Sequence, residues 1–273
     1  MKLNEYETES LRDIRKWEKE QHKGIHKKIL DATSRPVDYV VKRIGPERLK
    51  KFESAVEKTV KNLLSTATCT VDTDELMKRA RAHGVKIRSL SGLKKCDLSL
   101  LDECNRKHIK FHERAGAIQG AAAGLGGILT ATVDLTAVLI QDFHMIQEIA
   151  FCYGYDPIDI IEKEIILRIM EIGIGGSEIK FKALEEIDTL KKIKNKTIKK
   201  TTKKGVAVLG SKALEEYIEH LTTDLLVRLA PRALPVVSMV VSSHSNHEIM
   251  EHSGKAAFMV YRKRFIERKK KMA

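Results

Sequence analysis

The chain has 273 residues, and its 50 Lys and Arg residues against 37 Asp and Glu residues give a formal net charge of +13. Apolar residues make up 42% of the chain, a share typical of folded proteins that excludes wholesale disorder. Aromatic residues at 5% and only five prolines argue against an all-β sandwich. The length allows one large domain or two small ones, and we expect a mostly helical protein.

The cysteines and the first residues of the chain indicate the cellular compartment of the protein. Cys69, Cys96, Cys104 and Cys152 form no CxxC pair, which is typical of unpaired thiols in a reducing compartment. The segment MKLNEYETESLRD is charged and contains no apolar run, so we expect no signal peptide. We therefore expect a cytoplasmic protein, which could reach the inner face of the cell membrane.

Helical patterns dominate the first part of the chain. Residues 5–30 are rich in charge and carry apolar residues at helical spacing, which predicts an amphipathic helix. A second helix is expected over residues 36–64, because a proline near its start suits the first helical turn. Asp72 or Asp74 can cap a short helix that ends near Gly84.

The middle of the chain contains one ambiguous segment before a long helical region. Residues 85–93 alternate apolar and polar residues enough for a short strand, and a loop is the alternative. Helical patterning then extends from near Asp102 toward Tyr153.

The strongest local signal follows Tyr153. Gly154 suits the position just after a helix, Asp156 an N-cap, Pro157 the first helical position and Asp159 the first turn. We therefore predict a tight turn between two helices over these residues.

Three further helices are expected after this turn. One carries isoleucines between residues 158 and 169 and ends at the glycines that begin with Gly173. Another covers residues 214–229, before two prolines. Ser245 and Glu248 have the spacing of a capping box, which predicts the start of the last helix.

Residues 115–140 are rich in Gly and Ala and contain one ionisable residue, Asp134. Four of their glycines lie on one helical face: Gly116, Gly120, Gly124 and Gly127. Each glycine costs a helix about 1 kcal/mol relative to Ala, so close helix packing or membrane burial must offset this cost. The favoured interpretation is a close-packed helix or hairpin of a soluble bundle. Membrane burial, flanked by Lys107, Lys110 and Arg114, and a ligand-binding groove are the alternatives.

Two segments concentrate the positive charge. Residues 191–204 contain eight lysines and no acid, and residues 262–271 contain seven basic residues and one Glu. The first reads as a solvated linker or as an anionic-lipid contact; specific nucleic-acid binding is disfavoured because no aromatic platform accompanies the lysines. The lysines that we expect to contact an anionic surface are Lys191, Lys192, Lys199, Lys200, Lys203, Lys204, Lys269, Lys270 and Lys271.

Two groups of histidines are weak metal-ligand candidates. His244, His247 and Glu248 come close to a zinc motif but do not form HExxH, because the next histidine falls one position late. Cys104, His108 and His112 would share one face of a helix. Three ligands along one straight helix are too far apart for a single ion, although two of them could bind one together with a ligand from elsewhere in the chain. A solvated polar face is the favoured interpretation. No catalytic set and no cofactor motif stands out, and we expect no cofactor.

The chain resembles the EcsC family, the proteins encoded beside the Ecs-type ABC transporter in Firmicutes. The resemblance rests on the Gly-rich run that ends in Val133-Asp134-Leu135, on Gln141, Ile146, Ile149-Ala150, Tyr153-Gly154 and Asp156-Pro157, and on Leu234-Pro235-Val236, Asn246 and the stretch Tyr261 to Phe265. It implies a helical fold, a cytoplasmic or membrane-peripheral location and a link to transport or secretion. It implies no reaction, because the family has no established catalytic residues to carry over.

These observations lead to one prediction of fold and function. We expect a single all-α domain, in which amphipathic helices pack around a central Gly/Ala-rich helix or helical hairpin. Residues 1–34 would form an N-terminal amphipathic helix, residues 35–268 the EcsC-like domain and residues 269–273 a basic tail. The expected function is that of a non-enzymatic, membrane-associated accessory protein whose partner is an anionic membrane surface or a membrane protein. A metal-dependent hydrolase and a soluble binder of an unknown apolar ligand are the alternatives.

Overall fold

The computed structural model describes residues 3–22, 42, 45–65, 71–82, 84, 90–124, 128–175, 177–197, 211–229 and 238–271. All regular elements within these ranges are helices, which confirms the predicted all-α class. In chain order they are α1 (Glu5–His22), α4 (Pro46–Leu64), α5 (Thr73–Ala82), α6 (Leu90–Leu93), α7 (Leu98–Gly124), α8 (Ile128–Cys152), α9 (Ile160–Ile174), α10 (Ser177–Thr197), α11 (Ser211–Leu229) and α12 (Ser238–Lys271).

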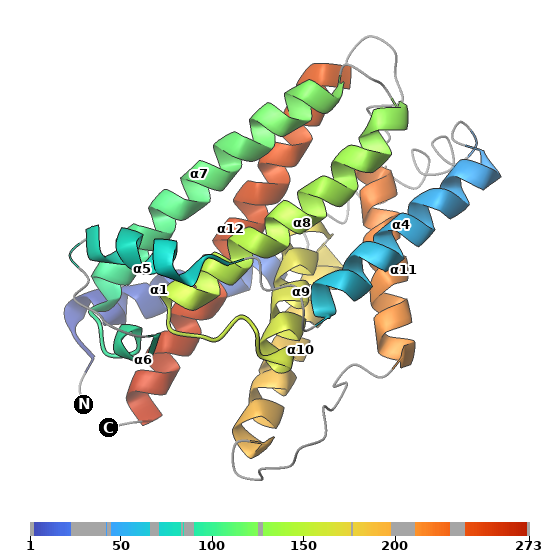
Figure 1. The fold of residues 1–273 in the computed structure, drawn as a ribbon. Coiled ribbons are helices and arrows are strands. Elements are labelled where there is room, and N and C mark those ends of the chain that lie inside the picture. The colour runs from blue at the N-terminus through green and yellow to red at the C-terminus, as the bar shows by residue number, and fades with distance from the viewer. Residues whose placement is uncertain are drawn as a thin grey trace.

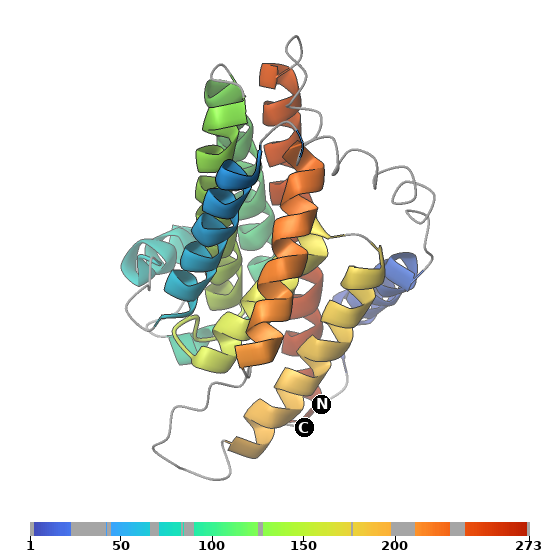
Figure 2. The same cartoon turned by 90° about the vertical axis from the view of Figure 1, so that its right-hand side faces the viewer.

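The long C-terminal helix α12 connects most of the bundle. It has 34 residues, which corresponds to a length of about 51 Å. It contacts α7, α8, α9 and α1, and α7, α8 and α12 run side by side in Figure 1. Figure 2 shows α10 next to α1, whereas α4 and α11 lie next to each other on the side that faces the viewer.

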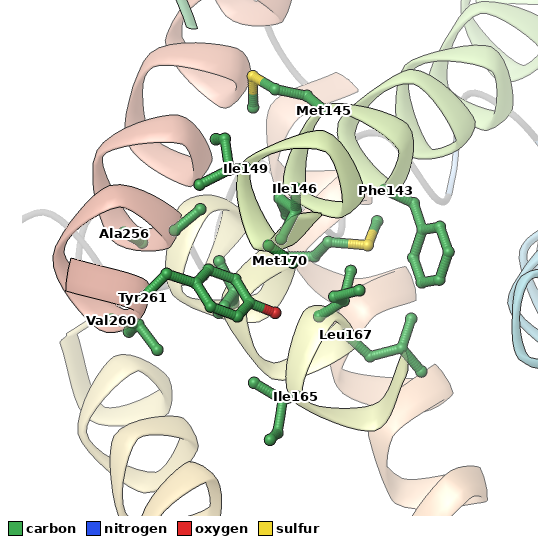
Figure 3. Close-up of a cluster of buried hydrophobic side chains, with 14 of the residues drawn as sticks. Phe143, Met145, Ile146, Ile149, Ile165, Leu167, Met170, Ala256, Val260 and Tyr261 are labelled. Atoms are coloured by element: carbon green, nitrogen blue, oxygen red, sulfur yellow. The ribbon is translucent and has the colours of Figure 1, made fainter. Parts of the chain in front are cut away.

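Helix α9 is the most enclosed element of the bundle. Every residue from 161 to 174 is buried, and α8, α10 and α12 pack around the helix together with α4 and α11. The enclosed residues include five charged ones, Glu162, Lys163, Glu164, Arg168 and Glu171. Figure 3 shows how side chains from three helices meet here: Phe143, Met145, Ile146 and Ile149 of α8, Ile165, Leu167 and Met170 of α9, and Ala256, Val260 and Tyr261 of α12.

Small residues allow α12 to approach its neighbours closely. A Cβ added at Gly173 of α9 would lie 2.7 Å from the Cα of Ser253 in α12. A Cβ at Gly254 of α12 would lie 2.8 Å from Ile109 Cγ2 in α7. The absence of a side chain at both glycines therefore sets the distance between α12 and the helices on its two sides.

Several local predictions are confirmed. The Asp72 carboxylate accepts a 2.9 Å hydrogen bond from the Glu75 backbone N–H, and therefore caps α5. Gly154 has a φ of 77°, and the backbone bonds Gly154 N–H to Phe151 O and Tyr155 N–H to Ala150 O close the end of α8 as a Schellman motif.

Three local predictions are wrong. Asp159, predicted in the first turn, is the N-cap of α9, because its side chain accepts the hydrogen bond from Glu162 N–H. Asp156, predicted as the N-cap, closes the preceding turn, and Pro157, predicted as the first helical position, lies in that turn. Ser245 does not begin the last helix, because α12 already starts at Ser238. In the predicted strand, residues 90–93 form the helix α6, and residues 85–89 lie outside the described part of the chain.

Candidate functional site

The outward-facing surface of α7 combines positive charge with exposed apolar side chains. Its residues are Arg106, Lys107, Lys110, Phe111, Arg114 and Ile118, which we call the α7 outer face. Neighbouring members lie one, three or four residues apart, so their side chains project from one side of the helix. Phe111 is 60% exposed and Ile118 is 73% exposed. Cations beside exposed apolar groups are typical of helices that lie on an anionic membrane surface.

Lys107 of the α7 outer face forms an ion pair within its own helix. Lys107 Nζ lies 2.9 Å from Glu103 Oε1, and both side chains are more than half exposed. An exposed pair of this kind contributes only about 0–1 kcal/mol, so Lys107 can exchange this partner for a negatively charged headgroup at little cost.

Helix α1 presents a second group of cations, which the sequence analysis missed. Arg12, Arg15, Lys16 and Lys19 are exposed and, with Glu20, line a surface cavity of about 380 Å³. Their spacing of three, one and three residues places them on one helical face, and this spacing was the available signal.

The predicted lysine contacts are only partly described. Lys191 of α10 forms ion pairs with Asp188 at 2.8 Å and with Glu267 of α12 at 2.9 Å, whereas Lys192 is exposed. Lys199, Lys200, Lys203 and Lys204 lie outside the described residues. The first residues of the segment 191–204 therefore form the end of helix α10, and Lys191 is paired with α12.

The C-terminal basic segment turns largely inward. Arg262 and Arg264 are only 3% and 5% exposed, so these two cations of the segment cannot contact a membrane surface. Lys269 forms an ion pair with the Glu7 carboxylate of α1, while Lys270 and Lys271 are exposed. The arginines have a structural reason to be buried, because each faces a buried carboxylate of another helix.

Among the predicted packing residues of the glycine-rich segment, only Gly116 has described surroundings. A Cβ at Gly116 would lie 2.9 Å from Met250 Cγ of α12, so this glycine lies against a neighbouring helix. Gly120 and Gly124 belong to α7 and Asp134 to α8, but their surroundings, and all of Gly127, lie outside the described residues. Within the described ranges, none of the helices is both long enough and apolar enough to cross a bilayer.

The predicted turn residue Tyr153 belongs to a buried polar network around Asp102 of α7. The Asp102 carboxylate accepts hydrogen bonds from Tyr153 Oη at 2.6 Å and from Tyr6 Oη of α1 at 2.7 Å. Arg262 Nε of α12 lies 2.7 Å from the same carboxylate. Burial raises the pKa of Asp102 above its ordinary value even though Arg262 and the tyrosine hydroxyls act to lower it. This network therefore ties α1, α7, the end of α8 and α12 together.

Six metal-ligand-type side chains face one another between α7 and α8. They are Cys104, His108 and His112 of α7 and His144, Glu148 and Cys152 of α8, which we call the α7–α8 polar cluster. On both helices the members are spaced by four residues. Because the two helices run antiparallel, the first member on α7 faces the last member on α8, and a ring nitrogen or thiol sulfur of Cys104, His108 and Cys152 lies within 4.8 Å of the others. The favoured sequence interpretation of a solvated polar face is therefore wrong for His108 and His112, which are both 5% exposed.

Glu148 lies in the middle of this cluster and contacts three histidines. Its carboxylate oxygens are 2.8 Å from His112 Nε2, 3.3 Å from His144 Nε2 and 3.6 Å from His108 Nδ1. Burial acts to raise the pKa of Glu148, but hydrogen bonds from His112 and His144 and the nearby imidazoles outweigh it and hold this pKa well below its ordinary value. The cluster therefore holds a negative charge that is largely removed from solvent.

The other predicted metal ligands do not meet in this way. His247 Nδ1 lies 3.2 Å from the backbone oxygen of Glu113, so this imidazole faces the backbone of α7. The His244 side chain lies outside the described residues. His247 and Glu248 are not among the three-donor groups found in the described part of the chain.

A further surface cavity, of about 480 Å³, lies between α4 and α11. Its lining includes apolar side chains but also four carboxylates, those of Glu53, Glu57, Glu215 and Glu219. A lining with this much negative charge is a poor match for a purely apolar ligand.

Comparisons with known proteins place the chain in a family. A family model described as the EcsC protein family matches residues 8–266. The chain is 25% identical over 261 residues to a Bacillus subtilis (strain 168) protein described as "Uncharacterized protein YdbA", and the match covers 94% of this chain and 92% of that protein. No solved structure matches the chain.

Proposed function

Because the chain belongs to the EcsC protein family, we propose that it is a non-enzymatic accessory protein that docks on an anionic membrane surface. The α7 outer face is the observation that carries this proposal. It presents four exposed cations and two exposed apolar side chains on one side of a helix that packs against α8 and α12.

The charges and the apolar groups act together on such a surface. Each Lys or Arg near an anionic leaflet contributes about 1 kcal/mol, so four cations contribute about 4 kcal/mol. Phe111 and Ile118 can add to this by entering the boundary between headgroups and acyl chains, which buries apolar surface that is exposed in the free protein. The net charge of +13 draws the whole molecule toward the same surface.

This docking mode fits a protein that works at the cytoplasmic face of a membrane. Anionic lipids are concentrated in the cytoplasmic leaflet, which is where clusters of exposed basic residues find their counterpart. Accessory work beside a membrane transporter or a secretion system, which the family resemblance implies, belongs to the same proposal.

Flotation with liposomes tests the proposal. Purified full-length protein is mixed with neutral phosphatidylcholine vesicles or with vesicles that also contain phosphatidylserine, at low and at high salt. We expect binding to the anionic vesicles that weakens as salt screens the charges. An absence of binding to both kinds of vesicle would refute the proposed function.

Charge reversal then tests the assigned surface. Lys110→Glu together with Arg114→Glu changes the charge of the α7 outer face by four units, and we expect it to abolish flotation. Lys50→Glu together with Lys51→Glu makes the same change at exposed positions of α4 and is the matched control, for which we expect flotation to persist. Equal loss in both variants would mean that net charge, and not the α7 outer face, determines binding.

A further inference from the structure

Three donors of the α7–α8 polar cluster have the arrangement of a metal site. A ring nitrogen of His108 and the Sγ atoms of Cys104 and Cys152 all lie within 4.8 Å of one another. Cys104 and Cys152 are each 2% exposed and His108 is 5% exposed, so the donors lie inside the bundle. They come from two different helices, which the antiparallel packing of α7 and α8 brings together.

We propose that Cys104, His108 and Cys152 bind a zinc ion between α7 and α8. Two thiolates and one imidazole are a preferred ligand set for Zn²⁺, whereas Mg²⁺ and Ca²⁺ prefer oxygen ligands. Zinc–sulfur bonds of about 2.3 Å and zinc–nitrogen bonds of about 2.0 Å in a tetrahedron require donors about 3.5–3.8 Å apart. The three donor atoms lie within 4.8 Å of one another, so side-chain rotation has to close at most about 1.3 Å.

The charges around the three donors favour a bound cation. Two thiolates neutralise the charge of Zn²⁺, so the occupied site adds no net charge to the interior. The Glu148 carboxylate, 3.6 Å from His108 Nδ1, adds a negative charge beside the site. A carboxylate next to a zinc-bound imidazole orients the ring and increases its basicity, and His112 and His144 hold this carboxylate in place.

The proposed ion would connect the two helices near the base of the hairpin. Cys152 is the last residue of α8, directly before Tyr153 and the turn into α9. A zinc ion here would fix the register of α7 against α8, because its ligands come from both helices. This proposal does not depend on membrane docking, since none of the three ligands belongs to the α7 outer face.

Metal analysis of the full-length protein under reducing conditions tests this proposal. We expect one zinc ion per chain after metal-free protein is incubated with Zn²⁺ and desalted. Replacement of zinc by Co²⁺ should give visible bands of tetrahedral cobalt and a near-ultraviolet charge-transfer band from thiolate to cobalt.

Three cysteine variants make the test specific. Loss of a residue that only hydrogen-bonds to a metal ligand weakens metal binding about 10–100-fold. Cys104→Ser and Cys152→Ser each remove a ligand itself, so each should weaken zinc binding by more than this. Cys96→Ser is the matched control, because Cys96 is a cysteine of the same described region that does not belong to the three donors, and it should bind zinc as the wild type does. Circular dichroism confirms that each serine variant is folded.

Three results would overturn the proposal. One is that the reduced wild-type protein takes up no stoichiometric zinc, including the case in which Cys104 and Cys152 are isolated as a disulfide and do not bind zinc after reduction. The others are equal zinc binding by Cys104→Ser, Cys152→Ser and Cys96→Ser, and a cobalt spectrum without a thiolate charge-transfer band.

Discussion

Replacement of Gly173 by alanine tests how α9 and α12 pack. A Cβ at this position would lie 1.8 Å from Ser253 Oγ and 2.7 Å from Ser253 Cα. Because the Cα belongs to the backbone of α12, rotation of a side chain cannot relieve this overlap, and one helix must shift. Ser253 Oγ also donates a 2.9 Å hydrogen bond to Asp142 Oδ2 of α8, so displacement of the hydroxyl disturbs a third helix.

The expected loss of stability follows from three contributions. Overpacking of a well-packed interior costs about 1–3 kcal/mol, and loss of a hydrogen bond to a charged group costs about 1.5–3 kcal/mol. Alanine has a helix propensity about 1 kcal/mol more favourable than that of glycine, which offsets part of this cost. We therefore expect Gly173→Ala to lower the free energy of unfolding by about 2–4 kcal/mol.

Gly116→Ala is the control for this variant. Its Cβ would meet Met250 Cγ at 2.9 Å, and Met250 is a flexible side chain that can adjust. We expect the free energy of unfolding of Gly116→Ala to differ from that of the wild type by less than about 1 kcal/mol, because the better helix propensity of alanine offsets the contact.

Urea unfolding followed by circular dichroism measures both variants. For Gly173→Ala the midpoint should fall while the slope m stays unchanged, and the thermal midpoint should fall by about 5–12 °C. If Gly173→Ala is as stable as the wild type, or if Gly116→Ala loses as much stability, the close approach of α9 and α12 does not control the packing as argued here.

Three further predictions concern buried polar groups. Tyr153→Phe removes the hydrogen bond to Asp102 and should lower the free energy of unfolding by about 1–3 kcal/mol in urea titrations. Glu148→Gln should flatten the acid dependence of the urea midpoint: the lowered folded-state pKa of this carboxyl stabilises the wild type above the unfolded-state pKa of about 4.3, and this contribution is lost as the pH falls toward the folded-state pKa. If the urea midpoints of the wild type and of Glu148→Gln differ by the same amount throughout this acid range, that reasoning is wrong. Glu162→Gln leaves the buried Arg264 guanidinium without its charged partner and should lower the free energy of unfolding by about 3–5 kcal/mol. A decrease of less than about 1 kcal/mol would show that water reaches this ion pair.

Local chemistry explains which helix boundaries were predictable. The Asp72 cap and the Gly154 motif depend on hydrogen bonds between residues three to five positions apart, so the sequence contains all of their parts. Asp156 and Asp159 are equally good capping residues in isolation. The choice between them depends on where packing against the bundle lets α9 begin, and this is not a property of the local sequence.

The α7–α8 polar cluster shows what a single-helix analysis misses. Cys104, His108 and His112 alone cannot hold one ion, because they follow one another along one axis. Their partners His144, Glu148 and Cys152 repeat the same four-residue spacing on a second segment. This repeated spacing was visible in the sequence, but its meaning depends on the antiparallel register of α7 and α8, which long-range packing determines.

The position of α12 constrains the order in which the chain can fold during synthesis. Lys263 of α12 pairs with Glu18 of α1 at 2.6 Å, and Lys269 pairs with Glu7, although these partners are 245 and 262 positions apart. Because α12 follows α1, α7, α8 and α9 in the chain and packs on all four, the apolar faces of these helices stay uncovered until α12 has been synthesised. A nascent chain of this protein therefore exposes apolar surface on four helices until residues 238–271 have left the ribosome.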